Sequence, residues 1–264
     1  MTEAVARGAA AEVVALGVDA GSTSWKAVAI DAAGAIVAHV VQPAEPRIAD
    51  QTEREVALLR TRTGAGPAVP VGATGYGRKR VQAARSLTEI TCHARGAFAR
   101  LKRPGVLIDV GGQDTKIIRI GPGGDVADFA MNDKCAAGTG RFLEVILGRL
   151  HVPLDQIGVY AARAERAVAV SSTCTVFAES EVVSLVAEGQ PVEGIVKGLH
   201  AALASRVAAL AGSMPQDGGV FMSGGVALNP AMVEALGAAL GRRVEIVPDP
   251  QLVGALGAAL AVRG

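Results

Sequence analysis

Apolar and polar positions along the chain predict two β-hairpins of the same design. Residues 13–31 read VVALGVDAGSTSWKAVAID, and residues 106–120 read VLIDVGGQDTKIIRI. Each segment has an apolar strand, the tripeptide Asp-x-Gly, four further residues, a lysine and a second strand. A glycine turn follows each copy, at 32–34 and at 121–124. This internal repeat predicts a chain built from two related halves.

The turns of these hairpins have the chemistry of a phosphate site. The alignment pairs Asp19 with Asp109, Gly21 with Gly111 and Lys26 with Lys116. Backbone N–H groups of a glycine-rich turn can hold phosphate oxygens, because glycine lets the backbone approach the ligand closely. The aspartate can hold Mg²⁺, usually through water. A single hairpin of this kind is more often structural, whereas two copies at the same spacing favour nucleotide binding.

A third glycine segment, GVFMSGGVALNP at 219–230, predicts a strand, a Ser-Gly-Gly turn and a helix that begins near Pro230. A nucleoside could lie against Gly224 and Gly225, although alone the segment would be an ordinary strand-to-helix turn. In this order, the three segments resemble the phosphate-1, phosphate-2 and adenosine motifs of the actin-like ATPase superfamily, which includes acetate and sugar kinases, heat-shock ATPases and actin.

That resemblance implies an α/β fold of two ribonuclease-H-like halves, with ATP and Mg²⁺ in the interdomain nucleotide cleft. We expect the first half at residues 1–97, with a C-terminal helix at 250–264 packing back on it. The second half, 98–249, contains the adenosine turn and the two cysteines discussed below.

Composition narrows the classes of function. The 264 residues are 50% hydrophobic and only 3% aromatic, and the net charge is +1. Such a chain has few rings to stack on bases and no field to attract nucleic acid or anionic lipid. The sequence has no unbroken run of about twenty apolar residues, and residues 1–12 do not read as a signal peptide. We therefore expect a cytoplasmic protein without a membrane span, in which three cysteines argue against a disulfide framework.

Two of the cysteines precede predicted helices. Cys135 lies before AAGTG and the amphipathic segment RFLEVILGRL, and Cys174 lies in SSTCTVFAESEVVSL, with Ser172 or Thr173 as the expected N-cap. The positive end of a helix dipole stabilises a thiolate. Two thiolates do not complete an iron–sulfur or structural zinc site, which takes four ligands. A two-fold dimer would supply the missing pair.

Longer motifs identify a family. The segments NDKCAAGTGRFLE, CTVFAESEVVSL, IDVGGQDTK, TGYGR, CHARGA and PQLVGALGAAL resemble the ATP-dependent activators of 2-hydroxyacyl-CoA dehydratases and the related ATPase subunits of class I benzoyl-CoA reductase. The resemblance implies one 4Fe-4S cluster bridging two protomers, with Cys135 and Cys174 as its ligands in this chain. The third cysteine, Cys92, has no ligand role in that pattern, and we expect it to pack in the core.

The resemblance also implies a mechanism. An activator takes one electron from ferredoxin or flavodoxin, binds ATP, changes the angle between the helices that hold the cluster, and passes the electron at lower potential to its client. The implied phosphate contacts are Gly21, Ser22, Thr23, Gly111, Gly112 and Gln113. The implied Mg²⁺ ligands are Asp19 and Asp109, and the implied adenosine contacts are Gly224 and Gly225.

Several roles have alternatives. Lys26 either reaches phosphate or only caps its hairpin, and Gln113 either orients the attacking water or is a polar turn residue. Glu179 and Glu181 lie two apart and so on different helix faces; we expect one of them to point toward the Mg²⁺ region and the other to be a solvated charge, and we take Glu179 as the catalytic candidate. The catalytic candidates are therefore Asp109, Gln113 and Glu179.

The client and the functional class also leave alternatives. A short chain with its own cysteine pair favours a dehydratase activator, either a homodimer or a heterodimer with a paralogous subunit. The alanine- and arginine-rich composition favours a benzoyl-CoA reductase subunit. In another class, the chain would be a small-metabolite kinase or a nucleotide-binding scaffold. A kinase has no reason to place two cysteines before helices, and either protein would be colourless.

Overall fold

The computed structural model describes residues 12–171, 174–212, 214 and 218–264. Contacts within it divide the chain into two compact units. The first comprises residues 1–104, 120–127 and 247–264, and the second comprises residues 105–119 and 128–246. The predicted C-terminal helix falls in the first unit.

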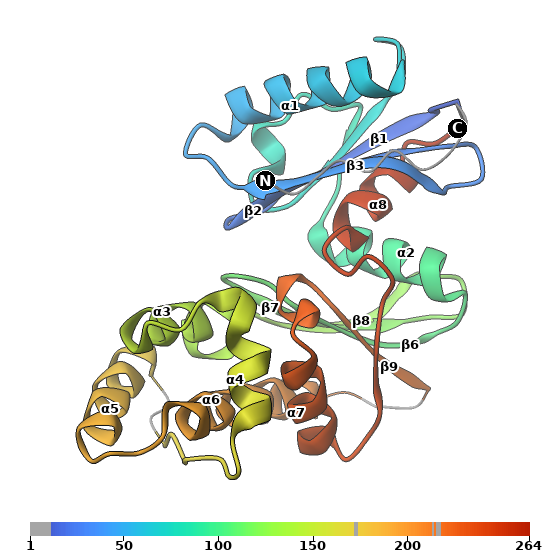
Figure 1. Cartoon of the computed structure of the whole chain (residues 1–264). Helices are drawn as coiled ribbons and strands as arrows, with labels where there is room; N and C mark the ends of the chain where they lie inside the picture. The colour runs from blue at the N-terminus through green and yellow to red at the C-terminus, as the bar shows by residue number, and fades with distance from the viewer. Residues whose placement is uncertain (1–11, 172–173, 213, 215–217) are drawn as a thin grey trace. The chain divides into compact units, whose positions relative to one another are not determined.

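A five-stranded sheet of order β3-β2-β1-β4-β5 forms the centre of the first unit (Figure 1). Its strands are β1 (Ala15–Ala20), β2 (Ser24–Ile30), β3 (Ile36–Pro43), β4 (Val71–Thr74) and β5 (Arg85–Ser86). β1 and β2 are the predicted hairpin, and they pair antiparallel with Asp19 opposite Lys26. The next neighbour, β4, runs parallel to β1. The glycine turn at Gly34, with φ of +82°, then leads into β3.

Helices cover both faces of this sheet. Helix α1 (Ile48–Thr63) packs on one face, where alternate strand residues such as Leu16 and Val18 contact Leu59. Helix α8 (Val253–Leu260) packs on the other face, against Ala15, Val28 and Ile30, and α2 (Glu89–Leu101) packs on α8. The chain passes through a short 3₁₀ turn, Arg78–Arg80, on its way from β4 to α2.

Glycines let α8 lie directly on the strands. A Cβ at Gly17 of β1 would lie 2.0 Å from the carbonyl oxygen of Ala255, and one at Gly72 of β4 would lie 2.1 Å from that of Ala258. Both positions therefore require glycine, because any side chain would push the helix away from the sheet. This contact returns the last helix to the sheet that begins the chain.

The second unit repeats the sheet order of the first. Its order, read from the opposite edge, is β8-β7-β6-β9-β10. β6 and β7 therefore occupy the same places in this sheet as β1 and β2 do in the first. The strands are β6 (Gly105–Val110), β7 (Thr115–Ile120), β8 (Val126–Asn132), β9 (Gly219–Ser223) and β10 (Val244–Ile246). The two matching mixed sheets confirm the predicted α/β architecture of two ribonuclease-H-like halves.

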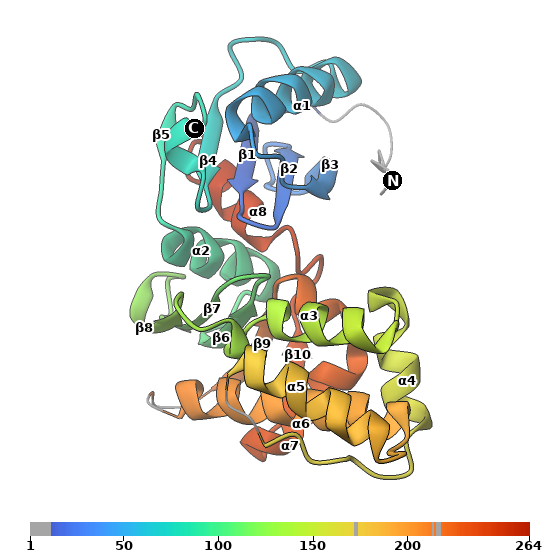
Figure 2. The ribbon, with the colours of Figure 1, turned by 90° about the vertical axis from the view of Figure 1, so that its left-hand side faces the viewer.

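Helices α3 (Gly140–Leu150), α4 (Ile157–Arg163), α5 (Thr175–Ala187), α6 (Val192–Ala211) and α7 (Pro230–Leu240) complete this unit, with short 3₁₀ turns at Ala136–Gly138, Leu154–Gln156 and Gly225–Leu228 (Figure 2). The predicted helix after Cys135 is α3, and its apolar stripe, including Phe142 and Ile146, is buried. Cys174 itself is the N-cap of α5, and the expected caps Ser172 and Thr173 lie outside the described residues.

Helix α6 is long and apolar. By length and composition this 20-residue helix could cross a membrane, but 56% of its most apolar window is buried inside the fold. Its core residues, such as Leu199 and Leu203, contact strands and helices of the same unit. Burial in a protein core therefore accounts for its hydropathy.

Candidate functional site

Strands β6 and β9 bring two predicted site segments together. They pair in parallel with Asp109 opposite Ser223, and the Ser223 hydroxyl donates a 2.7 Å hydrogen bond to the Asp109 carboxylate. The next residue, Gly224, has φ of +88°, and a Cβ there would lie 2.3 Å from the Val110 carbonyl oxygen. Only glycine fits this turn. The predicted Mg²⁺ ligand Asp109 thus adjoins the predicted adenosine turn, of which Gly225 is the exposed next residue.

Lys116 compensates the negative charge at the end of β6. Its ammonium lies 3.6 Å from the Asp109 carboxylate and 2.6 Å from that of Asp114. The Lys116 side chain is 3% exposed. A buried lysine is stable only when it is paired. Lys116 and the two carboxylates therefore form a single cluster of charged groups beside the turn.

The Gly111–Gln113 turn is fixed to the segment that follows Cys135. The Gly111 N–H donates to the Asp114 carbonyl and closes the turn. The carbonyls of Gly111 and Gly112 accept hydrogen bonds of 2.9 Å from the N–H groups of Gly140 and Arg141, at the start of α3. Gln113 lies exposed at the tip.

Two threonines add side-chain bonds to this connection. Thr139 Oγ1 donates to the Gly112 carbonyl at 3.2 Å, and Thr115 Oγ1 donates to the Gly138 carbonyl at 2.6 Å. Thr115 and Thr139 are both buried. Sequence reasoning missed both residues, because a threonine in a strand or before a helix has no distinctive pattern.

The first hairpin places Asp19 at the end of β1, buried and 3.3 Å from the Lys26 ammonium. Gly21, Ser22 and Thr23 form the turn between the strands, and the two hydroxyl residues are exposed. The structure therefore gives Lys26 a carboxylate partner within its own hairpin, in line with its alternative role as a cap.

Two further glycines surround the Asp19 carboxylate. A Cβ at Gly75, where φ is +94°, would lie 2.6 Å from Asp19 Oδ1, and a Cβ at Gly254 would lie 3.0 Å from Oδ2. The same Gly254 position is 2.8 Å from Cε1 of His93. These residues belong to the TGYGR, PQLVGALGAAL and CHARGA motifs, which were the only sequence signal for them.

Cys135 has an exposed, free thiol, and its backbone is held by two hydrogen bonds to the Asn132 side chain. The Asn132 amide donates to the Cys135 carbonyl at 2.7 Å and accepts from its N–H at 3.1 Å. A 3₁₀ turn, Ala136–Gly138, separates the cysteine from α3. The backbone that presents the thiol is therefore fixed from both sides.

Cys174 is also exposed and free. It directly precedes α5, and the Glu181 carboxylate on that helix accepts hydrogen bonds of 2.8 Å from the N–H and hydroxyl of Ser171. Glu181 thus holds Ser171 against α5. Helices α3 and α5, which follow the two cysteines, contact each other.

Glu179 contacts a neighbouring helix, and Cys92 lies in the core. Glu179 forms an ion pair with Arg149 of α3, and the structure gives it no contact with Asp109 or Gln113 among the described residues. Cys92 is buried in α2, where burial raises the pKa of its thiol to about 11. The packing role expected for Cys92 matches this location.

The donor set of one chain is incomplete for a metal centre. Across the described ranges, no three His, Cys, Asp or Glu side chains converge on one point. Two exposed thiols have the chemistry that iron–sulfur clusters require, and they supply half of the usual four ligands.

Comparison with known proteins agrees with these features. Residues 16–262 match the model of the BadF/BadG/BcrA/BcrD ATPase family. The activator of lactoyl-CoA dehydratase from Anaerotignum propionicum is 42% identical over 249 residues, covering 93% of this chain and 95% of that protein.

Two solved structures are similar along nearly their whole length. The activator of the 2-hydroxyisocaproyl-CoA dehydratase from Clostridium difficile, with bound ADPNP, has a TM-score of 0.87 at 38% identity, covering 94% of this chain and 93% of that one. Component A of the (R)-2-hydroxyglutaryl-CoA dehydratase from Acidaminococcus fermentans has a TM-score of 0.88 at 37% identity, with coverage of 95% and 97%. This chain belongs to the BadF/BadG/BcrA/BcrD ATPase family.

Proposed function

We propose that the chain is an ATP-dependent activator that passes single electrons at low potential to a 2-hydroxyacyl-CoA dehydratase. The observation that carries the proposal is the hydrogen-bonded connection between the Gly111–Gln113 turn and the segment that presents Cys135. A kinase needs no such connection between a phosphate-type turn and an exposed thiol. The dehydratase activators among its relatives support the client.

ATP and Mg²⁺ would be held by the residues that the motifs identify. In the second unit, Gly111 and Gly112 offer backbone donors to phosphate, Gly224 and Gly225 offer a flat surface to adenosine, and Asp109 orients Mg²⁺ through water. Gln113, exposed at the tip of the turn, orients the attacking water. In the first unit, Asp19 and the turn Gly21–Thr23 have the same chemistry. The ADPNP bound to the similar activator supports nucleotide binding.

Cys135 and Cys174 would hold a 4Fe-4S cluster together with the same two residues of a second copy. Both thiols are free and exposed, as ligands shared between subunits must be. A cluster bound there supplies one-electron chemistry, at a potential that depends on hydrogen bonds and solvent exposure around the sulfurs. A cluster shared in this way requires a dimer, and we propose a homodimer. We further propose that it works in the cytoplasm and receives its electron from ferredoxin or flavodoxin.

The same hydrogen bonds explain how ATP would drive electron transfer. A change in the Gly111–Gln113 turn on nucleotide binding or hydrolysis moves the carbonyls that Thr139, Gly140 and Arg141 contact. Gly138, held by Thr115, moves with them. Because Cys135 is three residues earlier, its position and exposure follow the state of the nucleotide.

The first test is anaerobic purification with measurement of colour, iron and molar mass. We expect a brown dimer with about four irons. The colour and the iron should be lost in Cys135→Ser and also in Cys174→Ser. Cys92→Ala is the matched control, because it removes a cysteine from the core and leaves both exposed thiols in place.

A colourless, iron-free monomer that hydrolyses ATP even after reconstitution with iron and sulfide would contradict the proposal and favour a kinase or a scaffold. With the cluster present, ATP-dependent activation of a purified 2-hydroxyacyl-CoA dehydratase is the expected result. Activation of a benzoyl-CoA reductase component instead would identify the other client.

A further inference from the structure

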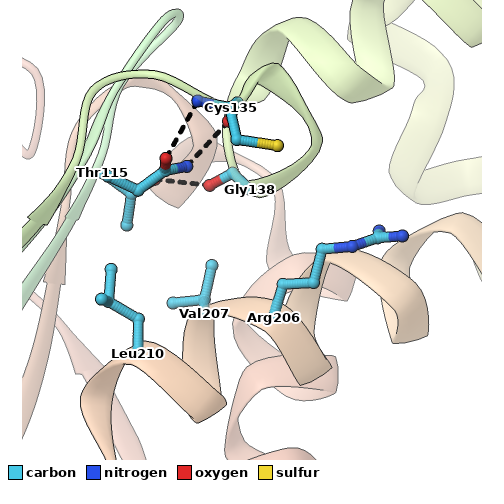
Figure 3. Close-up of a pocket in the computed structure, with 7 residues that line it drawn as sticks. Thr115, Cys135, Gly138, Arg206, Val207 and Leu210 are labelled. Atoms are coloured by element: carbon cyan, nitrogen blue, oxygen red, sulfur yellow. Dashed lines mark hydrogen bonds between the residues drawn. The ribbon is translucent and has the colours of Figure 1, made fainter. Parts of the chain in front are cut away.

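Arg206 of α6 faces Cys135 across a small surface pocket in the second unit. The loop before α3 forms one side of this pocket and α6 forms the other, as Figure 3 shows. The pocket is lined by Thr115, Asn132, Cys135, Gly138, Arg206, Val207 and Leu210. Among these residues, Arg206 has the only permanent charge.

The guanidinium is held in place by the core. It lies over the ring of Phe142, 4.9 Å from the ring centroid, and Phe142 is fully buried in α3. Such a cation–π contact fixes the position of an arginine whose stem packs on apolar surface. The neighbouring Val207 is buried as well. Arg206 is therefore a positioned charge, unlike the exposed Asp133 and Lys134 beside Cys135.

Arg206 keeps its positive charge in this partly buried place. Burial lowers the pKa of the guanidinium, and the charge interaction with Cys135 raises it. An arginine remains protonated in proteins even when its pKa is lowered. The charge beside Cys135 is thus permanent and does not respond to pH in the physiological range.

We propose that Arg206 is a positioning residue that would raise the reduction potential of a cluster ligated by Cys135 and stabilise its reduced state between electron uptake and delivery. This inference rests on the proposed function, because it assumes that Cys135 ligates the cluster. One electron enters from ferredoxin or flavodoxin, which is oxidised, and one leaves to the dehydratase, which is reduced. The electron adds one negative charge to the cluster, and a fixed positive charge nearby stabilises that charge. Arg206 supplies that charge in each protomer.

The test is the midpoint potential of the reconstituted, nucleotide-free dimer in a dye-mediated titration followed by visible absorbance and EPR. Arg206→Met keeps the apolar stem and removes the charge. We expect its reduction equilibrium to move about tenfold toward the oxidised state, which is about 59 mV more negative for one electron. Arg206→Lys keeps a charge and is expected to remain near the wild type.

Lys197→Met is the matched control. It removes one cation from the same helix, but Lys197 bonds to the Ala164 carbonyl and is not among the residues that line the pocket. Its potential should equal that of the wild type. A wild-type potential in Arg206→Met, or an equal shift in Lys197→Met, would overturn the role of Arg206 and leave the proposed function intact.

A second measurement covers the case in which Arg206→Met does not fold. Pulsed EPR of the reduced wild type, with arginine labelled by ¹⁵N, should show a weak nitrogen coupling that disappears in Arg206→Lys. An identical spectrum in both proteins would overturn the inference. A wild-type protein that binds no cluster would instead overturn the proposed function, and this inference with it.

Discussion

The hairpins at Asp19–Lys26 and Asp109–Lys116 share their spacing and their place in the sheet, yet they differ in what they contact. At one aligned position, Trp25 of the first hairpin donates its indole N–H to Thr52 of α1, in the core of its own unit. The equivalent Thr115 donates to Gly138, in the segment that presents Cys135. The first hairpin is thus bonded to a helix in its own core, and the second is bonded to the segment that follows Cys135.

The lysines differ in the same direction. Lys26 pairs with Asp19 and its side chain is 15% exposed, whereas Lys116 is 3% exposed and contacts two carboxylates. The duplicated motif therefore gives two turns of the same chemistry, and only the second connects directly to a candidate redox ligand within its own unit. The repeat predicts phosphate binding at both turns. The residue before the lysine, Trp25 in one hairpin and Thr115 in the other, determines which segment each hairpin contacts.

The largest expected effect is on stability, in Lys116→Met. Removing this lysine leaves a buried carboxylate uncompensated, which costs about 3–5 kcal/mol of unfolding free energy. Lys26→Met should cost less, about 1.5–3 kcal/mol, because the Lys26 side chain is 15% exposed and its ammonium pairs with a single carboxylate. Urea denaturation monitored by circular dichroism checks both, and equal losses would contradict the difference between the hairpins.

Asp109→Asn should reduce ATP hydrolysis by about 10²-fold or more, a size typical of lost electrostatic stabilisation. Asp109 adjoins both the phosphate-type turn and the adenosine turn, so one substitution disturbs two sets of contacts. Asp19→Asn should lose less, about tenfold, because the predicted adenosine turn lies beside Asp109. Phosphate release at saturating ATP measures this, and a greater loss in Asp19→Asn would reverse the assignment.

The next largest effect is a difference in alkylation rate between the cysteine of the first unit and the two cysteines of the second unit. In the cluster-free native protein at pH 8, Cys92 should react with iodoacetamide about a hundredfold more slowly than Cys135 or Cys174. Its raised pKa, about 11, keeps the buried thiol protonated until the pH approaches that value. Mass spectrometry of timed digests gives the three rates. Comparable labelling of all three would show that the α2–α8 packing opens readily.

Thr115→Val should have the smallest effect and be the most informative. The isosteric change removes one buried hydrogen bond, worth about 1 kcal/mol. We expect faster amide exchange at Cys135–Gly138 with little change in ATP hydrolysis. Trp25→Phe is the counterpart in the first hairpin, with a similar loss of stability and unchanged exchange at Cys135. Unchanged exchange in Thr115→Val would show that Thr115 does not hold this segment.

Sequence reasoning predicted the elements whose signal is local. The two hairpins, their glycine turns, the strand before Ser-Gly-Gly and helix α3 all appear where the pattern placed them. Helix α1 went unpredicted. The sequence left open which of Glu179 and Glu181 is solvated; the structure bonds Glu181 to Ser171, because the neighbours of each helix face depend on packing.

By itself, the sequence determined the repeat, the family and the pair of cysteines, because Asp-x-Gly turns and thiols are identities at fixed spacing. Only the tertiary structure decided that Gly224 adjoins Asp109, that Thr115 and Thr139 connect a turn to the segment after Cys135, and that Arg206 and Cys135 line one pocket. These contacts join residues that are distant along the chain. Strand pairing and helix packing bring them within hydrogen-bond and charge range, and no local pattern encodes that proximity.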